Sequence, residues 1–119
     1  MATPNLYALD TITPSNSIGA LANTNRTTVI DVTAEYCAKV NSLIIANVDG
    51  TNDATITVEV SVDNGSNYIK IASTINVPAD TSLNVLAAPI YLDETDLLAV
   101  TASAADDLTY FASYELMKD

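Results

Sequence analysis

The feature that most constrains the fold of this chain is the succession of short strand-like and turn-like segments in residues 75–103. This stretch, INVPADTSLNVLAAPIYLDETDLLAVTAS, places runs of Ile, Val, Leu and Tyr between clusters of Pro, Asp, Thr and Ser. The first group favours pleated strands and the second favours turns. Strands this short, joined by turns this tight, predict an antiparallel β structure.

The same pattern continues through the chain from residue 27 onward. Polar and apolar side chains alternate in residues 55–62, which predicts a strand with one buried face. Val62 lies on that buried face. On the next strand, Ile69 and Ile71 are expected to face inward. The apolar residues 39–47 are expected to be buried on both faces. Short strands at roughly ten-residue spacing predict an all-β fold, a single antiparallel β-sandwich of Greek-key or jelly-roll type with seven to eight strands.

The first 26 residues differ from the rest because they are rich in Asn, Ser, Thr and Pro and show no long alternation. Two interpretations remain open: a partly ordered terminus with a first edge strand, or an extended N-terminal arm that adds its backbone to the sheet of a neighbouring subunit. We therefore divide the chain into an N-terminal arm or edge segment, 1–26, and a β-sandwich domain, 27–119. The apolar residues predicted to bind a partner are Leu6, Tyr7, Leu9 and Ile12.

The charge of the chain argues against several classes of partner. Fifteen acidic residues against four basic ones give a net charge of −11. A chain this acidic cannot supply the Lys and Arg contacts on which binding to nucleic-acid phosphates rests, and it repels anionic membranes. The sequence has no apolar run long enough to span a bilayer. Its first residues lack the basic and apolar regions of a signal peptide, so we do not expect them to act as one. We therefore expect neither a nucleic acid nor a membrane as partner.

The residue types also argue against catalysis. The chain contains no histidine and one cysteine, Cys37, which is expected to be a small buried apolar group. Acidic clusters such as residues 93–96 favour solvated turns, and a calcium site is the alternative. Tyr68 and Tyr91 are candidate rim contacts for a sugar. We expect no enzyme activity, no metal site and no cofactor.

Three segments carry a resemblance to a known family: residues 77–83 (VPADTSL), 88–92 (APIYL) and 98–104 (LAVTASA). In this order and spacing they resemble small tailed-phage virion structural proteins of β-sandwich type, and the resemblance extends over residues 27–117. Asp80 stands where that family often has Gly, and Thr95-Asp96 stands where it often has Gly-Asp.

The resemblance implies a virion structural protein, a capsid decoration or cement protein that binds and stabilises the outer shell of a tailed phage. It implies the major capsid protein or other virion subunits as partners, together with copies of the chain itself as a homo-oligomer. The implied location is the capsid surface, after synthesis in the host cytoplasm. The alternative is a tail, baseplate or fibre component that acts as a carbohydrate- or receptor-binding module. Deleting residues 1–16 is expected to abolish shell binding and to leave the sandwich folded.

Overall fold

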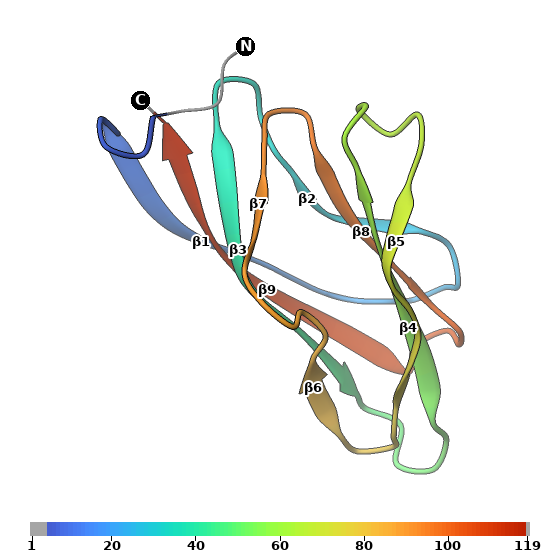
Figure 1. Cartoon of the computed structure of the whole chain (residues 1–119). Helices are drawn as coiled ribbons and strands as arrows, with labels where there is room; N and C mark the ends of the chain where they lie inside the picture. Colours follow the sequence, from blue (N-terminus) through green and yellow to red (C-terminus); the bar gives the residue numbers. More distant parts are fainter. Residues whose placement is uncertain (1–4, 119) are drawn as a thin grey trace.

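The computed structural model describes residues 5–118, which fold into nine β-strands (Figure 1). The strands are β1 (Thr11–Ala20), β2 (Thr27–Asp31), β3 (Cys37–Asn47), β4 (Ala54–Ser61), β5 (Ile69–Val77), β6 (Ser82–Asn84), β7 (Ile90–Leu92), β8 (Leu97–Ala102) and β9 (Leu108–Lys118).

The strands form two antiparallel sheets that pack against each other (Figure 1). The larger sheet has the order β1-β9-β3-β6, and β7 pairs with the other end of β3. The smaller sheet has the order β2-β8-β4-β5. The predicted all-β sandwich is confirmed, with nine strands in the described residues where the sequence predicted seven to eight.

Strand β1 lies within residues 1–26, for which the sequence predicts either an arm or an edge strand. It pairs with β9 from Thr11 opposite Lys118 to Ala20 opposite Thr109, without a register shift. Residues 11–20 are therefore the outermost strand of the larger sheet. The described residues before them, 5–10, lie outside the strands and are held by hydrogen bonds from Ala8 N to Asn5 O (3.0 Å) and from Asp10 N to Lys118 O (3.0 Å).

The core lies between the two sheets and consists mainly of aliphatic side chains from strands of both sheets and from residues that directly follow β1 and β2. Its largest fully buried members are Leu21, Leu43, Ile45, Ile56, Leu92, Leu98, Leu108, Val32, Val40, Val58, Val77 and Val100. Removing one such side chain from water stabilises the fold by roughly 1.5–3 kcal/mol. Cys37 is buried as predicted, and this burial raises the pKa of its thiol.

Two turns within residues 77–104 each contain a residue in the left-handed region of backbone space. Asp80 has φ 57° and Thr95 has φ 64°. Glycine adopts such values without steric cost, whereas a β-branched residue such as Thr is strained there. Asp80 and Thr95 therefore hold turn conformations that glycine adopts more readily.

Candidate interaction site

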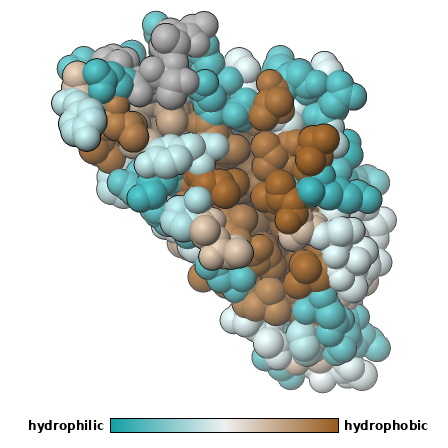
Figure 2. Space-filling view, viewed as in Figure 1, coloured by the Kyte–Doolittle hydropathy of each residue, from teal (hydrophilic) through white to brown (hydrophobic). Residues whose placement is uncertain are grey.

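An apolar groove lies at the open edge of the sandwich, between β5 of the smaller sheet and β7 of the larger sheet. It has a volume of about 530 Å³. Figure 2 shows apolar residues gathered in a band across this side of the molecule. The groove is lined by Val60, Val62, Asp63, Asn67, Ile69, Ile71, Ile90, Tyr91 and Leu92.

The exposed aliphatic residues of the groove correct part of the sequence analysis. Ile69 and Ile71 were predicted to face inward, and Val62 was placed on the buried face, but they are 68%, 47% and 72% exposed. Ile69 pairs with Val60, which packs on the core, so the alternation assigns the correct face. The larger sheet ends here in the three-residue strand β7, which is too short to cover that face. Periodicity predicts a direction for a side chain but not whether another element covers it.

Strand β5, which forms one wall of the groove, is an irregular edge strand. Its pairing with β4 shifts register between Ile56 and Val58 and again between Val58 and Glu59. Thr74, near the first shift, has φ 48°, and its N–H donates to Thr57 Oγ1 over 3.1 Å. Bulges of this kind twist an edge strand and interrupt its ladder, so they disfavour pairing with another strand.

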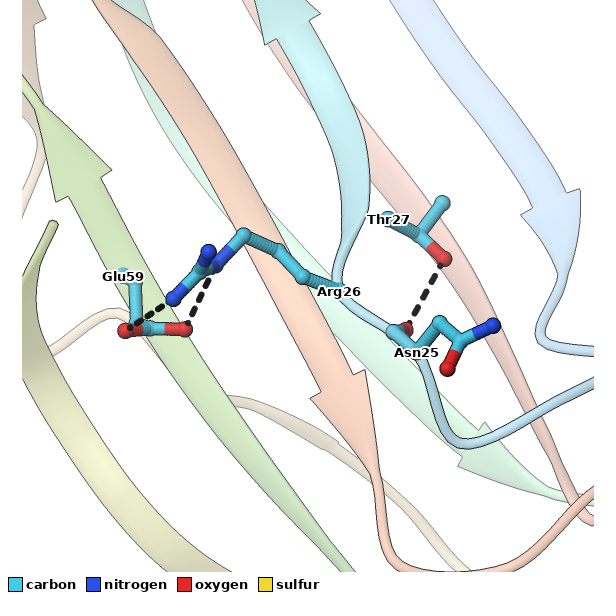
Figure 3. A network of polar contacts seen from close by, with 4 residues as sticks. All are labelled: Asn25, Arg26, Thr27 and Glu59. Atoms are coloured by element: carbon cyan, nitrogen blue, oxygen red, sulfur yellow. Dashed lines mark hydrogen bonds and ion pairs between the residues drawn. The ribbon is translucent and has the colours of Figure 1, made fainter. Parts of the chain in front are cut away.

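An ion pair fixes the outer face of the smaller sheet, opposite the core. The Arg26 guanidinium reaches across β8 and donates to both carboxylate oxygens of Glu59, over 3.1 and 3.2 Å (Figure 3). It also lies 3.8 Å from the ring centre of Tyr68. This two-point geometry explains how Glu59 can be 6% exposed, because a buried carboxylate needs a partner. Tyr68 is held in a cation–π contact, away from Tyr91 in the groove.

The loop between β4 and β5 forms the polar end of the groove and is stabilised by its own side chains. Asp63 accepts from Asn67 N and Ser61 Oγ, each over 2.8 Å, and from Asn67 Nδ2 over 2.9 Å. The hydrogen bonds from the side chain and backbone of Asn67, and then from Ser61, lower the pKa of Asp63. Gly65 takes φ 88° at the tip. The loop is thus a structured support for the groove.

Leu6, one of the four predicted partner-binding residues, lies next to the groove. Leu6 is 50% exposed and lines a hollow of about 310 Å³ together with Cys37, Tyr91, Asp93 and Asp96. Tyr91 lines both this hollow and the groove, so the two share one wall.

The other three predicted residues are not gathered around Leu6 in one patch. Tyr7 is fully exposed, and Leu9 is partly buried. Ile12 is 55% exposed on β1, separated from β7 by β9 and β3. Their role as partner-binding residues stays a prediction. Residues 11–16 belong to β1, so a deletion of residues 1–16 would remove part of the larger sheet. A deletion of residues 1–10 removes Leu6, Tyr7 and Leu9 and leaves β1 complete.

A second apolar surface crosses the outer face of the larger sheet. Ile18, Phe111 and Ile44 lie side by side on β1, β9 and β3, because Ile18 pairs with Phe111 and Phe111 with Ile44. They are 67%, 38% and 39% exposed, and we call them the outer row. The expectation that residues 39–47 are buried on both faces is wrong at Ile44. The sequence does give a signal for this surface. The apolar residues Leu43, Ile44 and Ile45 of β3 follow one another without a polar residue between them, so an apolar side chain lies on each face of the strand.

Carboxylates of the acidic turns accept hydrogen bonds from backbone N–H groups. Asp93 N donates to Asp96 Oδ2 over 2.8 Å, Glu35 N to Glu94 Oε2 over 2.9 Å, and Thr51 N to Asp49 Oδ1 over 2.8 Å. This is the usual role of an acidic residue in a turn. Among residues 5–118, no group of three or more His, Cys, Asp or Glu side chains is arranged to hold a metal ion.

The chain matches no protein-family model and no curated protein sequence. A chain of Bacillus endospore appendages, described as disulfide-linked pili, is similar in structure with a TM-score of 0.49 and 15% identity, covering 99% of this chain and 96% of that one.

A pentameric capsid protein from metagenomic phage sequences is also similar in structure. Its TM-score is 0.42 and its identity 16%, and the match covers 87% of this chain and 59% of that chain. Within the described part of the chain, no helix has the length and apolar character needed to cross a membrane.

Proposed function

We propose that this chain is a structural protein of a tailed-phage virion, a capsid decoration or cement protein that stabilises the outer shell by binding to it and catalyses no reaction. The observation that carries the proposal is the apolar groove between β5 and β7. A chain with a net charge of −11 that leaves such a surface open to water has a surface suited to a protein partner. The resemblance of residues 27–117 to small virion proteins supports a shell as that partner.

The groove suggests how the chain would bind. Val62, Ile69 and Ile71 offer aliphatic surface on one wall, and Tyr91 offers an aromatic face on the other. An apolar side chain of a shell subunit, held in the groove, would contact all four. Apolar anchors that fill a pocket carry most of the binding energy at protein interfaces. Many identical copies on a symmetric shell would add such small contacts into a large total.

The charge distribution suggests what surrounds that contact. Asp63 is the one ionised side chain among the groove-lining residues, so the apolar wall itself carries little charge. The remaining acidic surface would face solvent or lie opposite a basic patch of the shell. Complementary charge of this kind raises association rates and selects partners, and salt screens it.

The proposal is tested by sedimentation of the purified chain with phage shells that lack it. We expect the double variant Ile69→Ser, Ile71→Ser to remain folded and to lose most of its binding to the shell. Val48→Ser is the matched control, because Val48 is 59% exposed and lies outside the groove, and it should bind as well as the unaltered chain. Removal of residues 1–10 should weaken binding through the loss of Leu6. Unchanged binding by the groove variant would contradict the proposal.

One observation favours a second function, that of a carbohydrate- or receptor-binding module on a tail, baseplate or fibre. Tyr91 is 56% exposed at one wall of the groove, with Asp63 and Asn67 among the other lining residues. Aromatic faces beside polar groups can hold a sugar ring. A glycan array with and without a chelator tests this function, and signal that the Tyr91→Ala variant loses would favour it over shell binding.

A further inference from the structure

We propose that β1 pairs with β1 of a second copy of the chain, antiparallel and across a two-fold axis at Ile18, so that the larger sheets of the two copies become one continuous sheet. This inference does not depend on the proposed binding to a capsid. It rests on a comparison of the sheet edges, on the direction of the free backbone groups of β1 and on the absence of charge along it.

The two sheets end in strands that differ in how well they could accept another strand. On the larger sheet, β6 and β7 have three residues each. On the smaller sheet, β2 has five residues and one register shift, and β5 has two shifts. Short, bulged strands protect an edge against pairing. Strand β1 has ten residues paired without a shift, so it is the long regular edge of the described fold.

The free backbone groups of β1 can be assigned from its pairing with β9. Leu21 N donates to Leu108 O over 2.9 Å in the register that continues from β1. Hydrogen bonding alternates along an antiparallel strand, so Gly19 and Ser17 bond to β9, and the N–H and C=O groups of Ile18 and Asn16 point away from it. Pro14 has the same parity as Ile18, and a proline is tolerated where the missing N–H would face outward.

The absence of charge is what favours a second copy as the occupant of this edge. Residues 11–25 contain no charged side chain, although the whole chain has a net charge of −11. Two acidic molecules repel each other over most of their surfaces, and the β1 edge is a place where they can approach without bringing carboxylates together. Natural edge strands commonly carry a Lys that opposes such pairing, and β1 carries none.

The position of the two-fold axis follows from Pro14 and the outer row. With the axis at Ile18, Asn16 lies opposite Ala20 of the second copy, and Pro14, which has no N–H to donate, falls at the end of the paired segment. Ile18 then meets Ile18 of the second copy. The outer row of Ile44, Phe111 and Ile18 continues into the same three residues of the second copy. The contact is self-complementary, as an isologous dimer requires.

The test combines sedimentation equilibrium with two variants of β1 that leave its pairing to β9 intact. The unaltered chain should show a reversible dimer. Asn16→Pro removes an outward N–H, and Ile18→Lys places two like charges on the axis, so each should raise the dimer dissociation constant about tenfold or more. Val48→Lys is the control for added charge, because Val48 is exposed outside the strands, and it should dimerise normally.

Disulfide cross-linking tests the register. Cα atoms of a directly opposed hydrogen-bonded pair lie about 5.5 Å apart, within the range a disulfide spans. Ile18→Cys should therefore form a covalent dimer on mild oxidation. Ile12→Cys, exposed on the same strand but far from its counterpart in this register, should not. A chain that remains monomeric at high concentration, a dimer unaffected by both β1 variants, or equal cross-linking at the two cysteines would overturn the proposal.

Discussion

Strand β1 pairs with β9 in ten consecutive positions without a register shift, whereas β5 pairs with β4 through two shifts in nine residues. Strand β1 has no charged residue and no positive φ, while β5 carries Lys70 and has φ 48° at Thr74. The two edges therefore offer different surfaces. Strand β1 exposes backbone groups that another strand can use, and β5 exposes aliphatic side chains beside a groove. The β1 edge therefore suits backbone pairing, and the β5 edge suits packing of apolar side chains.

The largest expected effect comes from a change in the core on which both edges depend. Leu98 of β8 is fully buried between the sheets. Leu98→Ala should lower the free energy of unfolding by about 3 kcal/mol, because it removes apolar contacts and leaves a cavity. Chemical denaturation measures this, with exposed Val48→Ala as a control that should change stability by less than about 0.5 kcal/mol. Equal effects of the two variants would contradict the assignment of the core.

The next effect is specific to β1 and concerns its contact with Tyr110 of β9. A Cβ atom at Gly19 would lie 2.7 Å from the Tyr110 hydroxyl oxygen, closer than a real contact allows. Gly19→Val should therefore cost roughly 1–3 kcal/mol of stability by overpacking. The double variant Gly19→Val, Tyr110→Ala relieves the clash, so its stability loss should fall well below the sum of the two single losses. Additive losses would show that Tyr110 does not cover Gly19.

A smaller effect of opposite sign is expected in β5. Thr74 holds a left-handed conformation that strains a β-branched residue. Thr74→Gly should raise the free energy of unfolding by about 1 kcal/mol, because the strain is relieved and the N–H that donates to Thr57 is retained. Ser73→Gly is the matched control on the same strand and should be destabilising by roughly 0.5–1 kcal/mol, since Ser73 has no positive φ. Destabilisation by both glycines would contradict the strain at Thr74.

The smallest effect is a pH dependence at the loop that leads into β5. Hydrogen bonds to the ionised carboxylate lower the pKa of Asp63 in the folded chain. A group with a lowered folded pKa stabilises the fold above its unfolded pKa, near 3.9, and loses that contribution as the pH falls through the folded pKa. Asp63→Asn should therefore lose less stability than the unaltered chain between about pH 5 and pH 2. Parallel stability curves would show that Asp63 makes no such contribution.

The sequence predicted those parts of the fold that depend on local preference. The short strands separated by turns that it predicted across residues 75–103 correspond to β6, β7 and β8, because turn-forming residues separate these strands. The buried alternation of Ile56 and Val58 was also predictable, since period two assigns a face. Strand β1 was harder to assign, because a segment of Thr, Ser, Asn and Pro becomes a strand through its pairing with β9, which is distant in sequence.

The candidate site could not be predicted for a related reason. Ile69 and Ile71 have the composition and spacing of buried strand residues, and they are exposed because β7 ends after three residues. The outer row likewise depends on a cross-strand alignment of Ile18, Phe111 and Ile44 that no local pattern indicates. In both cases, the exposure of a side chain depends on which other strand packs against it or pairs with it. The sequence of a single strand does not contain that information.

Hydrogen–deuterium exchange at low and high protein concentration tests the difference between the two edges most directly. We predict that the amides of Asn16 and Ile18 exchange quickly in dilute protein and become protected as the concentration rises, while the outward amides of β5 exchange at the same rate throughout. Protection that develops on β5, or exchange at Asn16 and Ile18 that does not change with concentration, would contradict the account.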